Sequence, residues 1–378
     1  MTFKTVITKN TASLCAAALF IATGLTSCEG VYDSRQDCVS GVQLRFIHDY
    51  HMEPGANSFP LNVDCVTVYA FDPSGNYVGR FSETSEALRN EGYRMPLPLE
   101  SGDYHLIVYG GLACEHPTFD ITPEFREARA GGLSAENLFV TLPTDENGVS
   151  SAKLHDIENR TGGLFYGTYD LTVDSEDFGS DYTEHTVNLM KNTNNIQVIL
   201  QEIGHPYEVD VNDFEFTIVD DNFVLDSNNN AVSTASTGKQ HTYKPYATEN
   251  RIVGYVEPSG REGTQMDEDE SRPVQVGAAE FSTSRLFYQH MDKARLVITS
   301  KKETDNAGTG RTVIDIPLIA YLAAIRGFGT SWIKSDQEFL DRQSNWNLIF
   351  FLQNDRWVRT VISVNGWTVR INDIDLDL

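Results

Sequence analysis

Short runs in which apolar and polar residues alternate, separated by turn signals, constrain the fold of this chain more than any other feature. Val42, Leu44 and Phe46 alternate with polar residues, which is the period-two pattern of a strand with one buried face. The run 66–71 is β-branched and aromatic, and it ends at segment 72–76, where proline and glycine favour a turn. Repeated short strands of this kind predict an all-β fold of the β-sandwich type.

The same pattern continues through both halves of the chain. Further apolar runs predict strands at 104–109, 138–142, 164–173, 196–200, 214–219, 294–299 and 347–353. The chain has 378 residues, which suits two domains of ordinary size. We therefore expect two β-sandwich domains in tandem.

Two short helices and a hairpin are predicted late in the chain. Apolar residues recur at helical spacing from Pro317 to Gly327, and Ser335 with Glu338 forms a capping-box pattern. Asn365-Gly366 suits a two-residue hairpin turn between 357–364 and 367–371. Trp357 and Trp367 flank this turn, which favours a cross-strand pair between them.

The N-terminus has the pattern of an export signal. Lys4 and Lys9 precede an apolar run of about ten residues, which is shorter than the ~20 residues needed to span a bilayer. The run is followed by Leu25, Thr26, Ser27 and Cys28, the pattern at which a signal peptidase leaves a lipid-bearing cysteine. We expect residues 1–27 to be removed and Cys28 to carry diacylglycerol and an N-acyl chain, with residues 28–37 as an acidic tether. An ordinary signal peptide followed by a chance cysteine is the alternative.

The charge and motif content exclude several classes of function. The net charge of −25 would repel phosphate backbones, so nucleic acid is not an expected partner. The sequence has no nucleophile elbow, phosphate-binding loop or zinc-helix motif, so we expect no enzyme, no metal, no other cofactor and no small-molecule substrate. His48 and His51 stand three residues apart where a strand is expected to run into a loop, which favours a solvated turn over a metal site.

Three cysteines remain as disulfide candidates once the signal is removed and Cys28 is lipidated. Cys38, Cys65 and Cys114 allow one bridge and one free thiol in an exported protein. The sequence does not choose the pair, and a buried free cysteine is an equal alternative for each of the three.

Several of these segments, in this order, resemble the FimB family of fimbrial anchor lipoproteins of type V fimbriae. The matching segments are the lipobox ending at Cys28, the early Cys38, 66–75 (VTVYAFDPSG), 104–111 (YHLIVYGG), 164–167 (LFYG), 188–200 (NLMKNTNNIQVIL), 339–352 (FLDRQSNWNLIFFL) and 362–369 (ISVNGWTV). Each motif is weak alone, but together they cover nearly the whole chain. The resemblance implies two transthyretin-like β-sandwich domains, 38–190 and 191–378, with short helices in the second.

The resemblance also implies a structural role. Such a protein attaches a fimbrium to the outer membrane, limits its length and serves cell adhesion, as an anchor or another minor subunit. Its partners would be the fimbrial shaft subunits, by β-strand exchange, and the outer membrane, through the lipid on Cys28 at the cell surface. We expect its N-terminal strand to stay in place, and segment 367–378 is a candidate donor strand.

A surface glycan-binding lipoprotein is the alternative function. It would share the compartment and the β architecture, and exposed aromatic residues would stack on sugar rings. Core or hairpin packing is the more common role of the four tryptophans at 332, 346, 357 and 367.

Overall fold

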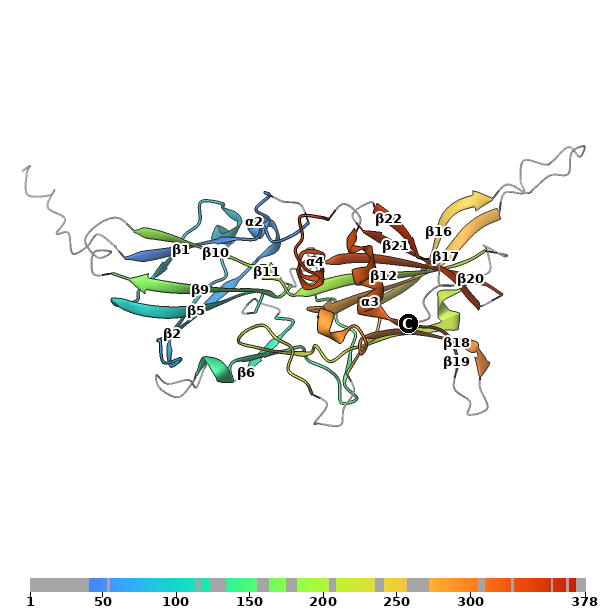
Figure 1. The fold of residues 1–378 in the computed structure, drawn as a ribbon, viewed down its shortest axis with the longest axis horizontal. Helices are drawn as coiled ribbons and strands as arrows, with labels where there is room; N and C mark the ends of the chain where they lie inside the picture. Colours follow the sequence, from blue (N-terminus) through green and yellow to red (C-terminus); the bar gives the residue numbers. More distant parts are fainter. Residues whose placement is uncertain are drawn as a thin grey trace, which may run out of the picture.

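Strands dominate the computed structural model of this chain, and they form two β-sandwiches placed end to end in an elongated molecule (Figure 1). The structure describes residues 41–52, 55–112, 114, 117–122, 134–154, 163–174, 182–203, 209–234, 241–256, 272–304, 310–327, 330–354, 356–364 and 367–371. The predicted all-β architecture with a few short helices is confirmed.

The first sandwich packs a three-stranded sheet on a five-stranded one. The orders are β10-β1-β4 and β11-β9-β5-β2-β3. The strands are β1 (Val42–Ile47), β2 (Val66–Phe71), β3 (Tyr77–Glu83), β4 (Met95–Leu97), β5 (Gly102–Gly110), β9 (Phe165–Val173), β10 (Thr183–Asn188) and β11 (Met190–Lys191). β1 buries every second residue, as its alternation predicts, whereas all six residues of β2 are buried.

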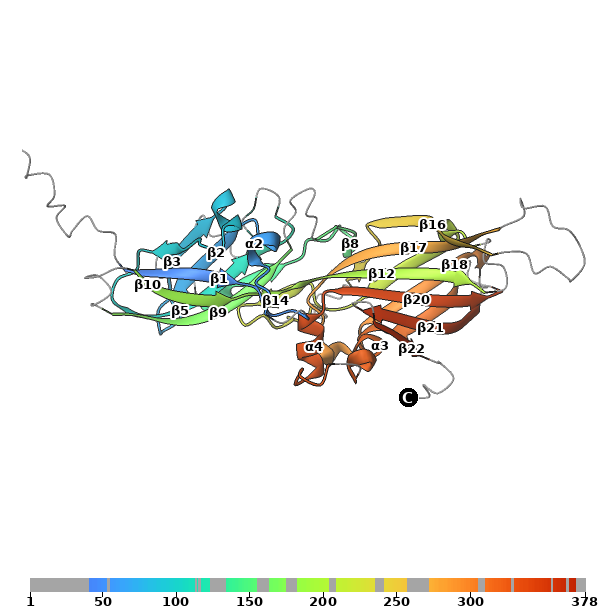
Figure 2. The ribbon, with the colours of Figure 1, turned by 90° about the horizontal axis from the view of Figure 1, so that it is seen from above.

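The second sandwich packs a six-stranded sheet on a five-stranded one. The orders are β16-β17-β12-β20-β21-β22 and β19-β18-β13-β15-β8. The strands are β8 (Val149–Ser150), β12 (Thr193–Glu202), β13 (Phe214–Val219), β15 (Thr242–Tyr243), β16 (Ala247–Val256), β17 (Arg272–Ser284), β18 (Arg295–Thr304), β19 (Gly310–Pro317), β20 (Asn345–Gln353), β21 (Arg356–Val364) and β22 (Trp367–Ile371). Figure 2 shows β12 running from the first sandwich into the second.

Short strands also pair across the boundary expected between residues 190 and 191. β14 (Val224–Asp226) joins a small sheet with β7 (Phe139–Thr141) and β6 (Asp120–Thr122), and β8 pairs in parallel with β15. One hydrophobic cluster accordingly contains Tyr109 from the first sandwich together with Phe223 and Phe281 from the second. The expected boundary falls within β11, and the apolar core is continuous across it.

The late helices form where the sequence predicts them. α3 (Leu318–Ala323) is followed by the 3-10 turn η7 (Ala324–Gly327), and α4 (Asp336–Arg342) begins after Ser335. The Ser335 hydroxyl accepts from the N–H of Glu338, as in a capping box, but the Glu338 carboxylate accepts from Lys334 rather than from the cap residue. The remaining short helices are α2 (Phe59–Asn62) and the 3-10 turns η1 (Glu86–Arg89), η2 (Ala135–Asn137), η4 (Val211–Asp213) and η6 (Tyr288–His290).

The C-terminal hairpin also forms, but its tryptophans do not face each other. Trp367 lies opposite Val364, and Trp357 lies opposite Leu352 on the neighbouring strand β20. The expected Trp357–Trp367 pair is therefore wrong. β21 is long enough to place Trp357 at the end of the strand remote from the turn.

One disulfide lies in the first sandwich and joins Cys65 to Cys114, with their Cα atoms 5.4 Å apart. Cys65 precedes β2 and Cys114 follows β5, and these two strands pair with Val66 opposite Gly110. The bridge therefore ties the ends of two neighbouring strands. Cys38 lies outside the described residues.

Removing this bridge should destabilise the protein. The bridge closes a chain segment of 49 residues, and the chain entropy it removes from the unfolded state corresponds to about 2–4 kcal/mol. We expect C65A/C114A to lower the free energy of unfolding by that amount in urea titrations. A reductant should lower the midpoint of the wild type and leave that of the double variant unchanged. Equal midpoints for the oxidised wild type and the double variant would contradict this role.

Candidate functional site

The residues predicted to carry the lipid lie outside the described residues. These are Leu25, Thr26, Ser27 and Cys28, so lipid attachment stays a prediction. The described chain enters β1 at Val42, at the end of the first sandwich remote from the second (Figure 2). β1 runs parallel to β10, which continues through β11 into β12, so β1 also points toward the second sandwich. Among the described residues, no helix has the length and apolar character needed to cross a membrane.

The six-stranded sheet of the second sandwich ends in two edge strands, β16 and β22. Such edges present backbone N–H and C=O groups that an added strand can pair with. β16 carries exposed Ile252, Val253 and Tyr255. Its pairing with β17 shifts register between Ile252 and Gly254. A bulge of this kind bends an edge and interrupts regular pairing there. β22 is the strand at the start of the candidate donor segment 367–378.

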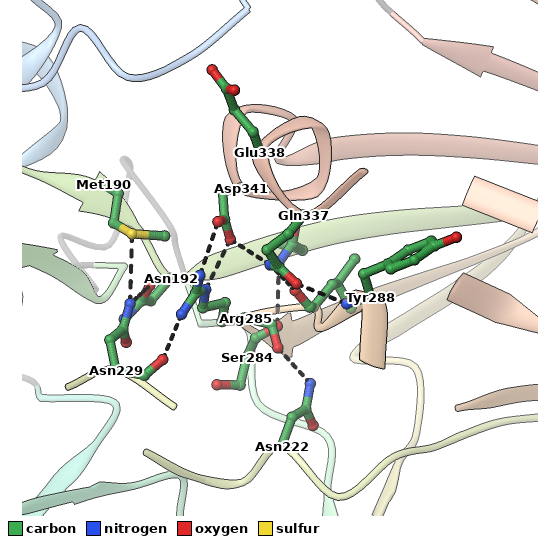
Figure 3. Close-up of polar contacts among 12 residues, drawn as sticks. Met190, Asn192, Asn222, Asn229, Ser284, Arg285, Tyr288, Gln337, Glu338 and Asp341 are labelled. Atoms are coloured by element: carbon green, nitrogen blue, oxygen red, sulfur yellow. Dashed lines mark hydrogen bonds and ion pairs between the residues drawn. The ribbon is translucent and has the colours of Figure 1, made fainter. Parts of the chain in front are cut away.

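A buried ion pair between Arg285 and Asp341 forms the centre of the junction between the sandwiches (Figure 3). The Nε and Nη2 atoms of Arg285 each donate to the Asp341 carboxylate at 2.8 Å, which makes the pair bidentate. The two side chains are only 14% and 6% exposed. Gln337, one turn earlier in α4, donates to the same carboxylate at 2.9 Å. The buried Asp341 carboxylate therefore accepts hydrogen bonds from both Arg285 and Gln337.

The second partner of the Arg285 side chain is the turn that follows β14. The Arg285 Nη1 atom donates to the carbonyl of Asn229, which adopts a positive φ of 63°. The side chains of Asn229 and Asn192 bond each other in both directions, at 2.6 and 3.1 Å. Tyr166 of β9 donates to the carbonyl of Ser227 in the same turn, at 2.8 Å. The network thus joins the first sandwich, the β11–β12 connection and the second sandwich.

His48 lies on the other side of the junction and is nearly fully buried. Its Nδ1 atom lies 2.7 Å from the carbonyl oxygen of Leu189, so it donates and leaves Nε2 as an acceptor. His51 lies beside it, with ring centroids 5.3 Å apart, and bonds the carbonyl of Ala56. Among the described residues no group of three or more His, Cys, Asp or Glu side chains could hold a metal ion. Both imidazoles instead fix the loop that follows β1.

The comparisons with known proteins agree with this architecture. The family model of fimbrillin-A associated anchor proteins Mfa1 and Mfa2 matches residues 34–373, which is most of the chain. The chain belongs to this family. The resemblance to fimbrial anchor proteins is thereby confirmed.

Individual relatives support the same assignment. The minor fimbrium anchoring subunit Mfa2 of Porphyromonas gingivalis is 26% identical over 192 residues, which is 49% of this chain and 54% of that protein. The match thus spans about half the length of that relative. A crystal structure described as an adhesin from Bacteroides thetaiotaomicron is 37% identical, covers 88% of this chain and 98% of that one, and has a TM-score of 0.70. The fimbrial anchor protein Mfa2 from P. gingivalis shares the fold, with a TM-score of 0.58, 17% identity, and coverage of 87% and 98%.

Sequence reasoning missed the junction residues of this family member. Arg285, Asp341 and Asn229 come from three distant segments and carry no recognisable local motif. The only signal was the expected domain boundary at Lys191, which directly precedes Asn192 of the junction network. Buried polar partners far apart in sequence are not visible without the fold.

Removing one charge of the Arg285–Asp341 pair should lower the free energy of unfolding more than removing both charges. In D341L the buried Arg285 cation loses its partner, and we expect a loss of about 3–5 kcal/mol in the free energy of unfolding. In R285M/D341L no charge remains unpaired, so the double variant should be more stable than D341L. Urea unfolding of the wild type, both single variants and the double variant gives the coupling energy. Losses that simply add would contradict a coupled pair.

His48 should make the stability of this family member depend on pH. Burial, opposed by the hydrogen bond to Leu189 and aided by His51 and Lys191, lowers the pKa of His48 from 6.5 to about 4. Between pH 6.5 and about pH 4, His48 therefore binds a proton more readily in the unfolded chain than in the folded protein. The stabilisation is complete above pH 6.5 and is lost as the pH falls toward about 4.

The variant H48N provides the measurement, because the asparagine amide can replace the Nδ1–H donor but does not titrate. Between about pH 7 and about pH 4.5 the wild type should lose about 2–3 kcal/mol more unfolding free energy than H48N. The carboxylates shared by both proteins cancel in this comparison. Identical pH profiles would show that His48 is not buried in its neutral form.

Proposed function

We propose that this protein anchors a fimbrium to the outer membrane through a lipid on Cys28. The family match over residues 34–373 is the observation that carries the proposal. An anchor needs a membrane end and a subunit end, and the elongated arrangement of the sandwiches suits this requirement. β1 starts at one end of the molecule, and the edges β16 and β22 lie in the other sandwich (Figure 2).

The shaft subunit would join at an edge of the six-stranded sheet by strand addition or exchange. β22 is our preferred edge, because it is a regular edge strand, whereas β16 is interrupted by a register shift. Strand addition satisfies the backbone groups of an open edge without changing the fold of the acceptor. Binding a first subunit without offering a second growing end would also limit fimbrial length.

If the protein acts as an anchor, its N-terminal strand β1 would stay in place. β1 is the central strand of β10-β1-β4, and Leu44 and Phe46 belong to the core of the first sandwich. Its removal would separate β10 from β4 and expose that core. A cut between Cys28 and β1 would also separate the folded protein from its lipid.

Surface glycan binding remains the alternative function. A flat aromatic platform would favour it, but the exposed Tyr255 lies in β16 and the exposed Trp332 lies in the loop before α4. The ring of Trp332 faces the guanidinium of Arg342, 5.1 Å from its centroid, and is engaged by that contact. This arrangement gives less support to glycan stacking than the family match gives to anchoring.

Substitution of Cys28 tests the anchoring model in cells. C28A should move the protein from the outer-membrane fraction to the soluble fraction and release fimbriae into the medium, because no acyl chain would hold it. C38A is the matched control and should stay in the membrane with fimbriae attached. Retention of C28A in the membrane would exclude attachment through this cysteine. Release of C28A with fimbriae still attached to the cells would exclude the anchoring role.

A further inference from the structure

A polar cleft opens at the junction, on the side of His48. It has a volume of about 230 Å³ and lies between the loop after β1, strand β11 and the end of α4. Its lining residues are His48, His51, Met52, Ser58, Asn62, Lys191, Arg342, Gln343, Ser344 and Asn345. Within the described part of the chain, no carboxylate lines this cleft, although the protein as a whole carries a net charge of −25.

Lys191 gives the cleft its charge. Its ammonium group has no hydrogen-bond or ion-pair partner among the described residues. Burial alone lowers the pKa of Lys191 from 10.5 to about 8, so the side chain is still mostly protonated at neutral pH. The side chain is only partly buried and lines the cleft, where an anion that enters could pair with its ammonium group. The missing partner points to a bound anion.

The second cation of the cleft is already neutralised. Arg342 donates from Nε to the Glu338 carboxylate at 2.8 Å, and its guanidinium lies over the ring of Tyr50, 4.0 Å from the centroid. Its charge is therefore compensated and its position is fixed. The described lining residues thus present one uncompensated positive charge, which matches a monoanion better than a dianion.

Neutral groups of the cleft add a second requirement. The Nε2 atom of His48 is an acceptor, because Nδ1 donates to Leu189. The amide of Asn62 donates to the Ser58 carbonyl, which leaves its side-chain oxygen as a further acceptor. A ligand that satisfies these atoms needs hydrogen-bond donors next to its anionic group, and hydroxyl groups provide them without adding a positive charge beside Lys191. The volume is below the ~300 Å³ typical of pockets for drug-sized molecules, so the ligand is small.

We propose that this cleft binds a small hydroxylated carboxylate, of the size and chemistry of a sugar acid. The carboxylate lies against the Lys191 ammonium, and a ligand hydroxyl donates to His48 Nε2. The ligand would contact residues from both sandwiches and would therefore stabilise their junction. This binding role is independent of the anchoring function proposed above.

Isothermal titration calorimetry on the full chain in detergent micelles tests the proposal, with glucuronate as the probe and glucose as its neutral counterpart. We expect glucuronate to bind at least about tenfold more tightly than glucose, which corresponds to about 1.4 kcal/mol. K191Q should lose at least tenfold in glucuronate affinity. K301Q, which removes an exposed lysine of β18, is the matched control and should bind as the wild type does.

Two further arms identify the chemistry that is recognised. H48N keeps a donor toward Leu189 but lacks the Nε2 acceptor, so it should weaken glucuronate binding and leave acetate binding unchanged. Glucuronate should also raise the thermal unfolding temperature of the wild type and not that of K191Q, which should itself remain folded because it removes a desolvated charge.

Four outcomes would overturn the proposal. These are no heat of binding for glucuronate, equal affinity in the wild type and K191Q, acetate binding as tightly as glucuronate, and inorganic phosphate binding more tightly than glucuronate. The last two would assign the cleft to a simple anion or to a phosphate in place of a sugar acid.

Discussion

The buried pair of Arg285 and Asp341 joins the end of β17 to helix α4, and Arg285 extends the link to the turn after β14. Its cost is desolvation, and only complete hydrogen bonding offsets that cost. Gln337 and the Asn229 carbonyl supply the remaining bonds, so the network favours the observed arrangement of the end of β17, helix α4 and the turn after β14. The continuous apolar core supplies the area buried between the sandwiches, and this network adds directional hydrogen bonds at their junction.

Many of the strands could be predicted from the sequence, because their signals are local, but the long strands β16 and β17 were not among those predicted. β13 forms at 214–219 as predicted, and β9 and β20 lie within two residues of the predicted runs. Ser335 marks the start of α4 because a cap acts on its own backbone neighbours. The pairing of β14 with β7 could not be predicted, since a three-residue strand has no periodicity to detect and owes its stability to tertiary packing.

The functional features depend on the fold in the same way. The sequence offered three cysteines, and only the pairing of β2 with β5 brings Cys65 next to Cys114. Lys191 was visible only as a boundary residue. Its position in a cleft whose described lining holds no carboxylate is a property of three segments that meet in space, and no pattern along one of them records it.

The parallel pairing of β1 and β10 has a mechanical consequence. Val42 lies opposite Thr183 and Ile47 opposite Asn188, and β10 continues toward the second sandwich. A pull on the chain before Val42, resisted at the second sandwich, would slide these two strands past each other along their length. All the hydrogen bonds of the pair would resist together, whereas strands peeled from one end yield one bond at a time. The fold thus places a shear-resistant joint directly behind the segment through which any tether would act.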